Sequence, residues 1–121
     1  MMKMKPTDSE MEILQVLWTK GPCTVREVYE SLEKKEVGYT TILKLMQIMT
    51  EKQMVTRNTS TKSHLYNANI SKEKIEHQFL DRFIETVYNG NTSRLIMQAL
   101  GNHKASKEEI ELIKQYLDNL Q

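Results

Sequence analysis

Two threonines and a lysine at the start of an apolar segment are the first residues of this chain whose types and spacing suggest chemistry. They lie in the stretch GYTTILKLMQIMTEKQMV, residues 38–55, where Thr40 and Thr41 are followed by Lys44. A threonine can hydrogen-bond to a base or a phosphate, and a lysine suits guanine or a phosphate. On a helix, Thr40 and Lys44 face away from the apolar side, and Thr41 lies at its margin. The pattern by itself leaves two interpretations open: contact with a base or a phosphate, or helix entry with a solvated face.

Three more polar side chains belong to a predicted β-hairpin after this segment. Two strand-like runs, residues 54–58 and 63–69, flank the polar tip TSTK, an arrangement typical of a hairpin. Arg57 lies on the first strand, and Lys62 and His64 lie around the tip, where cations of a wing would follow a neighbouring phosphate backbone. A solvated turn is the alternative, and a lone histidine here is a hydrogen-bonding residue rather than a metal ligand.

Residues ahead of the apolar segment complete the candidate set. Thr24 and Arg26 open a short helix, where backbone N–H groups commonly meet phosphate, although Thr24 is also useful as the helix cap. Tyr39 is amphipathic, and two roles stay open for it: packing under the helix or giving its hydroxyl to a phosphate. Cys23 is the only cysteine, so it cannot form an internal disulfide, and we expect a small packing residue.

Helical periodicity and capping patterns predict a mostly α fold with a small β-hairpin. Capping boxes are expected at Thr7 with Glu10 and at Ser106 with Glu109. Two short helices, a longer helix and a hairpin, in this order, are typical of a winged helix-turn-helix, whose third helix enters the major groove. The predicted helices are TDSEMEILQVLW, VREVYESLEK, the apolar segment from Tyr39, KEKIEHQFLDRFIETVYNG, SRLIMQALG and SKEEIELIKQYLDNL. The predicted core face of the third helix comprises Ile42, Leu45, Met46 and Met49.

The last three helices are expected to form a separate domain. A seam near residues 69–71 divides the chain into a winged-helix domain, residues 5–70, and a three-helix C-terminal dimerisation domain, residues 71–121. The rear helices carry wide apolar stripes and have little else to pack on, so we expect them to pair with a second copy. The predicted dimer contacts are Ile75, Phe79, Phe83, Val87, Leu95, Leu100, Ile113 and Leu117.

Composition excludes several classes of protein. The chain has 121 residues and a formal net charge of +1, so no strong field points to a nucleic acid or a membrane. No apolar run approaches the roughly 18 residues of a membrane span, and MMKMKPTDSE lacks the apolar stretch of a secretory signal. We expect a cytoplasmic protein. The histidines are far apart and no glycine-rich phosphate loop occurs, so neither an enzyme, a metal site nor a cofactor is expected.

Taken together, these segments resemble the penicillinase and methicillin-resistance repressors, the BlaI/MecI/CopY family of antibiotic-resistance regulators. The likeness runs from about Lys5 to Leu120 and rests on TDSEMEILQVLW, TVREVYESL, YTTILKLMQIMTEKQMV, SHLYNANIS and LIMQALG…ASKEEIELIKQYL. It implies a homodimeric winged-helix repressor that binds a palindromic operator on double-stranded DNA and dimerises through its C-terminal helices. The family's recognition-helix contacts map onto Thr40, Thr41 and Lys44.

The resemblance also implies an induction route. In the family, a membrane sensor with a metalloprotease domain responds to β-lactam, and the repressor is cut inside its dimerisation domain. By position the cut falls between Gln98 and Ala99, where studied repressors have an asparagine followed by an aromatic residue. Leu43 and Ile48 stand where some relatives have arginine, which argues for a different operator. The chain ends in DNLQ without the cysteine-rich motif of the copper-responsive branch, so that branch is disfavoured.

One alternative function stays open, a winged-helix protein-interaction module that does not bind DNA. Fold alone does not determine function, and the near-neutral charge fits such a module. The two functions differ at the face that carries Thr40, Lys44, Arg57 and Lys62. A DNA-binding protein should gather these side chains into one positive surface, whereas an interaction module should expose an apolar patch there.

Overall fold

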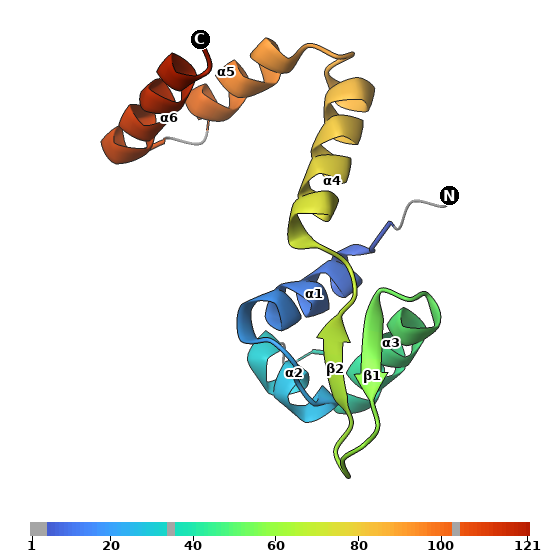
Figure 1. The fold of residues 1–121 in the computed structure, drawn as a ribbon. Coiled ribbons are helices and arrows are strands. Elements are labelled where there is room, and N and C mark those ends of the chain that lie inside the picture. The colour runs from blue at the N-terminus through green and yellow to red at the C-terminus, as the bar shows by residue number, and fades with distance from the viewer. Residues whose placement is uncertain (1–4, 34–35, 103–104) are drawn as a thin grey trace. The chain divides into compact units, whose positions relative to one another are not determined.

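The computed structural model describes residues 5–33, 36–102 and 105–121. Three helices, an antiparallel two-stranded hairpin and three further helices follow one another in these residues, as the sequence predicted (Figure 1). The elements are α1 (Asp8–Lys20), α2 (Val25–Leu32), α3 (Tyr39–Glu51), β1 (Val55–Asn58), β2 (Leu65–Ala68), α4 (Lys72–Val87), α5 (Thr92–Asn102) and α6 (Lys107–Asn119). The chain divides into two compact units, residues 1–75 and 76–121.

Short-range hydrogen bonds set where the helices begin and end. Thr7 and Ser106 each accept a hydrogen bond from the backbone N–H three residues later, and the glutamates there accept from the cap N–H in return. Both predicted capping boxes are therefore confirmed. Gly21 ends α1 with φ of +82°, a value that glycine adopts without steric cost. The second helix was predicted to reach residue 34, which lies outside the described residues, but α2 ends at Leu32 because Glu33 is left-handed.

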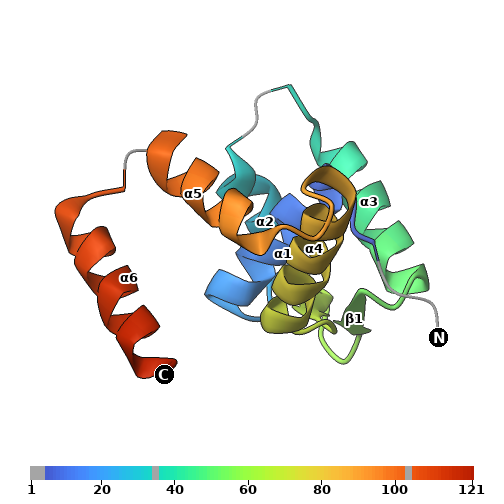
Figure 2. The same ribbon diagram turned by 90° about the horizontal axis from the view of Figure 1, so that it is seen from above.

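The first unit has one hydrophobic core. Helices α1, α2 and α3 pack around it, and the hairpin lies against α1 and α3 (Figures 1 and 2). From α3 the core takes Ile42, Met46 and Met49, whereas Leu45 is only half-buried. The remaining members are Ile13, Leu14, Leu17, Cys23, Val25, Val28, Met54, Val55 and Tyr66. Because α3 buries this one face, its opposite face stays in solvent.

A backbone bridge ties the hairpin to the start of α2. The Cys23 N–H donates to the Tyr66 carbonyl at 3.0 Å, and the Tyr66 N–H donates to the Cys23 carbonyl at 2.7 Å. The strands themselves are shorter than predicted, and Arg57 is paired with Tyr66 across them. Since Thr24 directly follows Cys23, this bridge places the N-terminus of α2 beside the hairpin.

Glu10 links the start of α1 to the end of α3. Its side chain is only 2% exposed; one carboxylate oxygen accepts from the Thr7 N–H and the other forms an ion pair with the Lys52 ammonium, both at 2.9 Å. Burial by itself raises the pKa of Glu10, but the hydrogen bonds from Thr7 and the charge of Lys52 outweigh it and hold the pKa below its ordinary value.

We expect Glu10→Gln to destabilise the first unit at neutral pH by roughly 1.5 kcal/mol, because the ion pair is lost while the shape is kept. The folded-state pKa is lowered, so the wild-type contribution is complete above the unfolded value near 4.5 and disappears as pH falls through the folded value. Urea unfolding followed by the fluorescence of Trp18, the single tryptophan, should show a stability difference that narrows below pH 4.5. A difference that stays constant with pH would contradict this role.

The second unit has no buried side chain in its described part, residues 76–102 and 105–121. Its helices instead expose large apolar side chains. These are Phe79, Leu80, Phe83, Val87, Ile96, Met97, Leu112, Tyr116, Leu117 and Leu120. Helices in water owe most of their stability to the burial of an apolar face, so this unit lacks within one chain the core that would hold it together.

The boundary between the units differs from the predicted domain boundary at residue 70. It falls after Ile75, about one turn into α4. The reason is that Ile75 is only 3% exposed, in contrast to the exposed apolar residues that follow it on the same helix.

Candidate nucleic-acid interface

The exposed face of α3 carries the predicted recognition residues. Thr40 and Lys44 are exposed, as the helical spacing predicted; Gln47 is exposed as well, and Leu43 is half-buried. Gly38, the residue before α3, offers no side-chain cap. The Thr41 N–H already donates to the Gly38 carbonyl at 3.1 Å, and the N–H groups before it keep the capacity to bind an anion. This end of α3 therefore presents hydrogen-bond donors and a positive charge to solvent.

Thr41 lies at the edge of this face. It is exposed, but it also lines a small hollow with Ser9 and Glu12 of α1 and with Leu45 of its own helix. Its position agrees with the predicted place at the margin of the polar side. Thr41 consequently has less freedom than Thr40 or Lys44 to meet a ligand that approaches α3 from solvent.

Five of the predicted residues come together in one open hollow of about 300 Å³ between α2, α3 and the hairpin. In this hollow, predicted residues from the start of α2 and the start of α3 lie beside those of the hairpin tip. The predicted residues that line it are Thr24, Arg26, Tyr39, Lys62 and His64, joined by Val25, Leu43, Ser63 and Tyr66. Arg57 is exposed on β1 but does not line this hollow.

Arg26 lies over two aromatic rings, of which Tyr39 lines this hollow and Tyr29 does not. Its guanidinium carbon lies 4.5 Å from the ring centre of Tyr39 and 6.0 Å from that of Tyr29. The two rings meet edge to face, with centres 5.8 Å apart and planes at 83°. Tyr39 is also partly buried against the hydrophobic core of the first unit. The contact of Tyr29 with Arg26 was not predicted, although the spacing of three residues on a helix is a recognisable signal.

Thr24 is engaged as a helix cap. Its hydroxyl accepts from the Glu27 N–H at 3.1 Å, and the Glu27 carboxylate accepts from the Thr24 N–H at 2.9 Å. The backbone hydrogen bond from Thr24, followed by its hydroxyl, lowers the pKa of Glu27. This capping box also keeps the Glu27 carboxylate at the helix start, in contact with its own cap.

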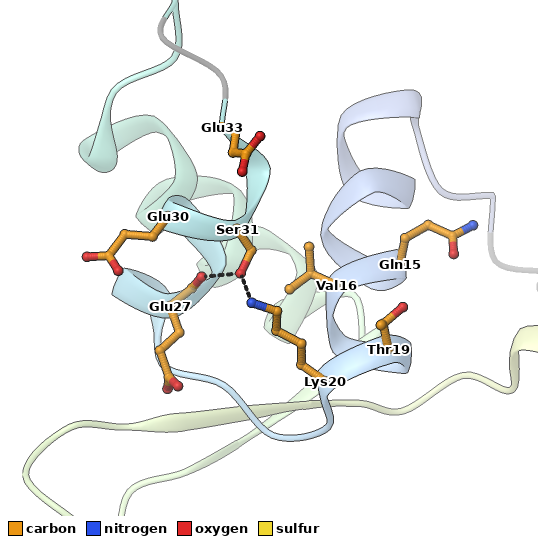
Figure 3. Close-up of a pocket in the computed structure, with 8 residues that line it drawn as sticks. All are labelled: Gln15, Val16, Thr19, Lys20, Glu27, Glu30, Ser31 and Glu33. Atoms are coloured by element: carbon orange, nitrogen blue, oxygen red, sulfur yellow. Dashed lines mark hydrogen bonds between the residues drawn. The ribbon is translucent and has the colours of Figure 1, made fainter.

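A larger hollow of about 570 Å³ lies between α1 and α2. Its rim carries the carboxylates of Glu27, Glu30 and Glu33, and the Lys20 ammonium there donates to the Ser31 hydroxyl at 2.7 Å (Figure 3). Ser31 in turn donates to the Glu27 carbonyl (Figure 3). Three carboxylates beside one hydrogen-bonded ammonium disfavour the binding of a polyanion. This hollow is therefore not the candidate nucleic-acid interface, although it is larger than the one beside the hairpin.

Other kinds of site find little support in the structure. No helix in the described part of the chain is long and apolar enough to cross a membrane. Among the same residues, no three His, Cys, Asp or Glu side chains are grouped so that they could hold a metal ion. Two surfaces therefore remain as candidates for binding a ligand. They are the hollow between α2, α3 and the hairpin, which carries Arg26 and Lys62, and the exposed face of α3.

The chain matches the penicillinase repressor family over residues 6–119. It is 24% identical over 113 residues to a penicillinase repressor of Staphylococcus aureus, which covers 93% of this chain and 90% of that protein. It is 27% identical over 117 residues to a penicillinase repressor of Bacillus licheniformis, with 93% and 88% covered. The methicillin resistance regulatory protein MecI of S. aureus strain N315 is 22% identical over 113 residues, with 93% and 92% covered.

Proposed function

This chain belongs to the penicillinase repressor family of transcriptional regulators, which are not enzymes, and we propose that it represses transcription as a homodimer bound to a palindromic operator. The observation that carries the proposal is the juxtaposition of the exposed α3 face with the cationic hollow of the hairpin. In such a complex α3 enters the major groove and the hairpin follows the neighbouring backbone.

Two features of the first unit support DNA over a protein partner. Lys44 on α3 and Arg26, Lys62 and His64 around the hollow supply positive charge or hydrogen-bond donors on the side that phosphates would approach. The large exposed apolar side chains all lie at Phe79 or beyond, and none falls in the described residues before it. An interaction module would need such a patch beside α3, so the rival function loses its main support.

The lack of a core in the second unit supports the homodimer. Of the predicted contacts, Phe79, Phe83, Val87 and Leu117 are exposed, and Leu95, Leu100 and Ile113 are half-buried. Ile75 is already buried within the single chain, so it has almost no surface to offer, and we leave it out of the interface. A two-fold dimer carries two equivalent α3 helices, which is why its operator is a palindrome.

For induction we propose cleavage between Gln98 and Ala99 by a membrane sensor metalloprotease that responds to β-lactam or another signal. Both residues are exposed on α5, where the Gln98 side chain accepts a hydrogen bond from Asn102 at 3.0 Å. Cleavage requires α5 to unwind locally, which a unit without a buried core allows readily. The cut would detach α6 from α4 and so weaken the dimer. Recovery of only intact chains from induced cells would contradict this route.

The proposed function is tested by selecting bound fragments from random duplex DNA and measuring affinity against salt. We expect an inverted repeat, and a log–log plot of affinity against salt that falls with a slope of about −0.9 for each phosphate neutralised. A scrambled duplex of equal length, the control, should bind more weakly with a similar dependence on salt. Failure to enrich any sequence, together with affinity that is independent of salt, would exclude the proposal.

A further inference from the structure

We propose that Tyr39 is a positioning residue that acts through its ring, holding the Arg26 guanidinium at the hollow so that Arg26 binds one phosphate of the DNA backbone. The inference rests on the proposed DNA binding and assigns separate roles to two residues of that interface. Arg26 makes the contact, and Tyr39 determines where the contact is made.

The aromatic rings give Arg26 a support that an exposed arginine usually lacks. Tyr39 is the first residue of α3 and Tyr29 belongs to α2, so the stack spans both helices of the helix-turn-helix. A guanidinium 4.5 Å from the Tyr39 ring centre is attracted by the π-system. The N–H groups of a guanidinium lie in its plane, so contact with a ring face leaves them able to donate to a phosphate.

Among the described residues, no acidic side chain forms an ion pair with Arg26. The adjacent Glu27 is held in the capping box with Thr24. None of the described residues that line the hollow carries a carboxylate, and its polar members near the hairpin tip are Lys62, Ser63 and His64. Cations and hydroxyl groups without a carboxylate favour an anionic ligand, and duplex DNA supplies it as a backbone phosphate.

The ring and the hydroxyl of Tyr39 can be separated by substitution. Tyr39→Phe keeps the ring and removes only the hydroxyl, so it should lower operator affinity far less than Arg26→Ala does. Tyr39→Leu should lower affinity about two- to five-fold through loss of the cation–π contact. Arg26→Ala should lower it at least as much and reduce the steepness of the salt dependence by roughly 0.9 for each lost phosphate contact. In the Tyr39→Leu background, Arg26→Ala should add less than it does alone, because the two residues act as a unit.

Lys20→Ala is the matched control, because it removes one positive charge from the same unit at the other hollow; its salt dependence should match the wild type. If Tyr39→Leu fails to fold, the affinity of Tyr39→Phe and the salt dependence of Arg26→Ala still test the inference. A loss of affinity in Tyr39→Phe as large as that in Arg26→Ala, fully additive losses in the double variant, or an unchanged slope in Arg26→Ala would each overturn the inference. If the wild type binds no duplex, both the proposed function and this inference fail. If it binds DNA and one of these three outcomes occurs, only the inference fails and the proposed function stands.

Discussion

Phe83→Ala is expected to dissociate the proposed dimer and to weaken operator binding by about 100-fold. The reason is that two α3 recognition helices held in one dimer would then bind their half-sites independently. Phe83 is 45% exposed in the single chain, and its ring lies against that of Tyr88 with centres 5.6 Å apart. Large exposed aromatic side chains in the middle of an apolar surface commonly dominate an interface. Sedimentation and operator titration should therefore change together.

Asp81→Ala is the control for Phe83, since Asp81 is an exposed polar residue of the same helix. It should leave both sedimentation and affinity as they are in the wild type. A Phe83→Ala protein that still sediments as a dimer at low micromolar concentration would show that this residue lies outside the interface. Because the substituted residue is exposed and remote from the first-unit core, the fold of α1 to β2 should be unaffected.

Lys44→Ala is expected to weaken operator binding by about 1–3 kcal/mol for each half-site if Lys44 reads a base. Lys44 is exposed one turn after Thr40, on the face of α3 that the core residues Ile42 and Met46 leave in solvent. A base contact also predicts relaxed preference at one position of each half-site. A phosphate contact would instead weaken all sequences alike and flatten the salt dependence, so titration against single-base variants of the operator distinguishes the two.

Lys20→Ala serves as the control here as well, because it removes the same charge away from α3. It should change neither affinity nor base preference. If the Lys44→Ala protein folds normally and binds the selected operator as tightly as the wild type, the assignment of Lys44 to the recognition surface is wrong. The stability of the first unit, measured by Trp18 fluorescence, provides the check on folding.

Interactions between residues close together in the chain were predictable. Thr7 with Glu10 and Ser106 with Glu109 form capping boxes across three residues, and the apolar repeat of α3 identified Ile42 as a core residue. At the start of α2, Thr24 was predicted as the cap, but its reciprocal hydrogen bond with Glu27 was not. Such bonds depend on local backbone geometry, which helical spacing already specifies.

Contacts between distant segments were not predictable in the same way. The ion pair of Glu10 with Lys52 joins residues that are 42 positions apart, and Cys23 meets Tyr66 through a backbone bridge. Backbone groups form hydrogen bonds whatever the side chain is, so the residue types at the two positions do not predict this bridge. The burial of Ile75 was missed for a related reason, because its place in the apolar repeat of α4 equals that of Phe79 or Phe83.

The sequence by itself determined the order of the helices and the hairpin, the polar face of α3 and the apolar faces of α4 to α6, since each depends on residue spacing within one element. Only the tertiary structure decided that Arg26, Tyr39 and His64 share one hollow and that Tyr39 offers its ring to Arg26. The physical reason is that packing of the core and the bridge to β2 bring α2, α3 and the hairpin tip together, and that geometry depends on contacts between distant residues.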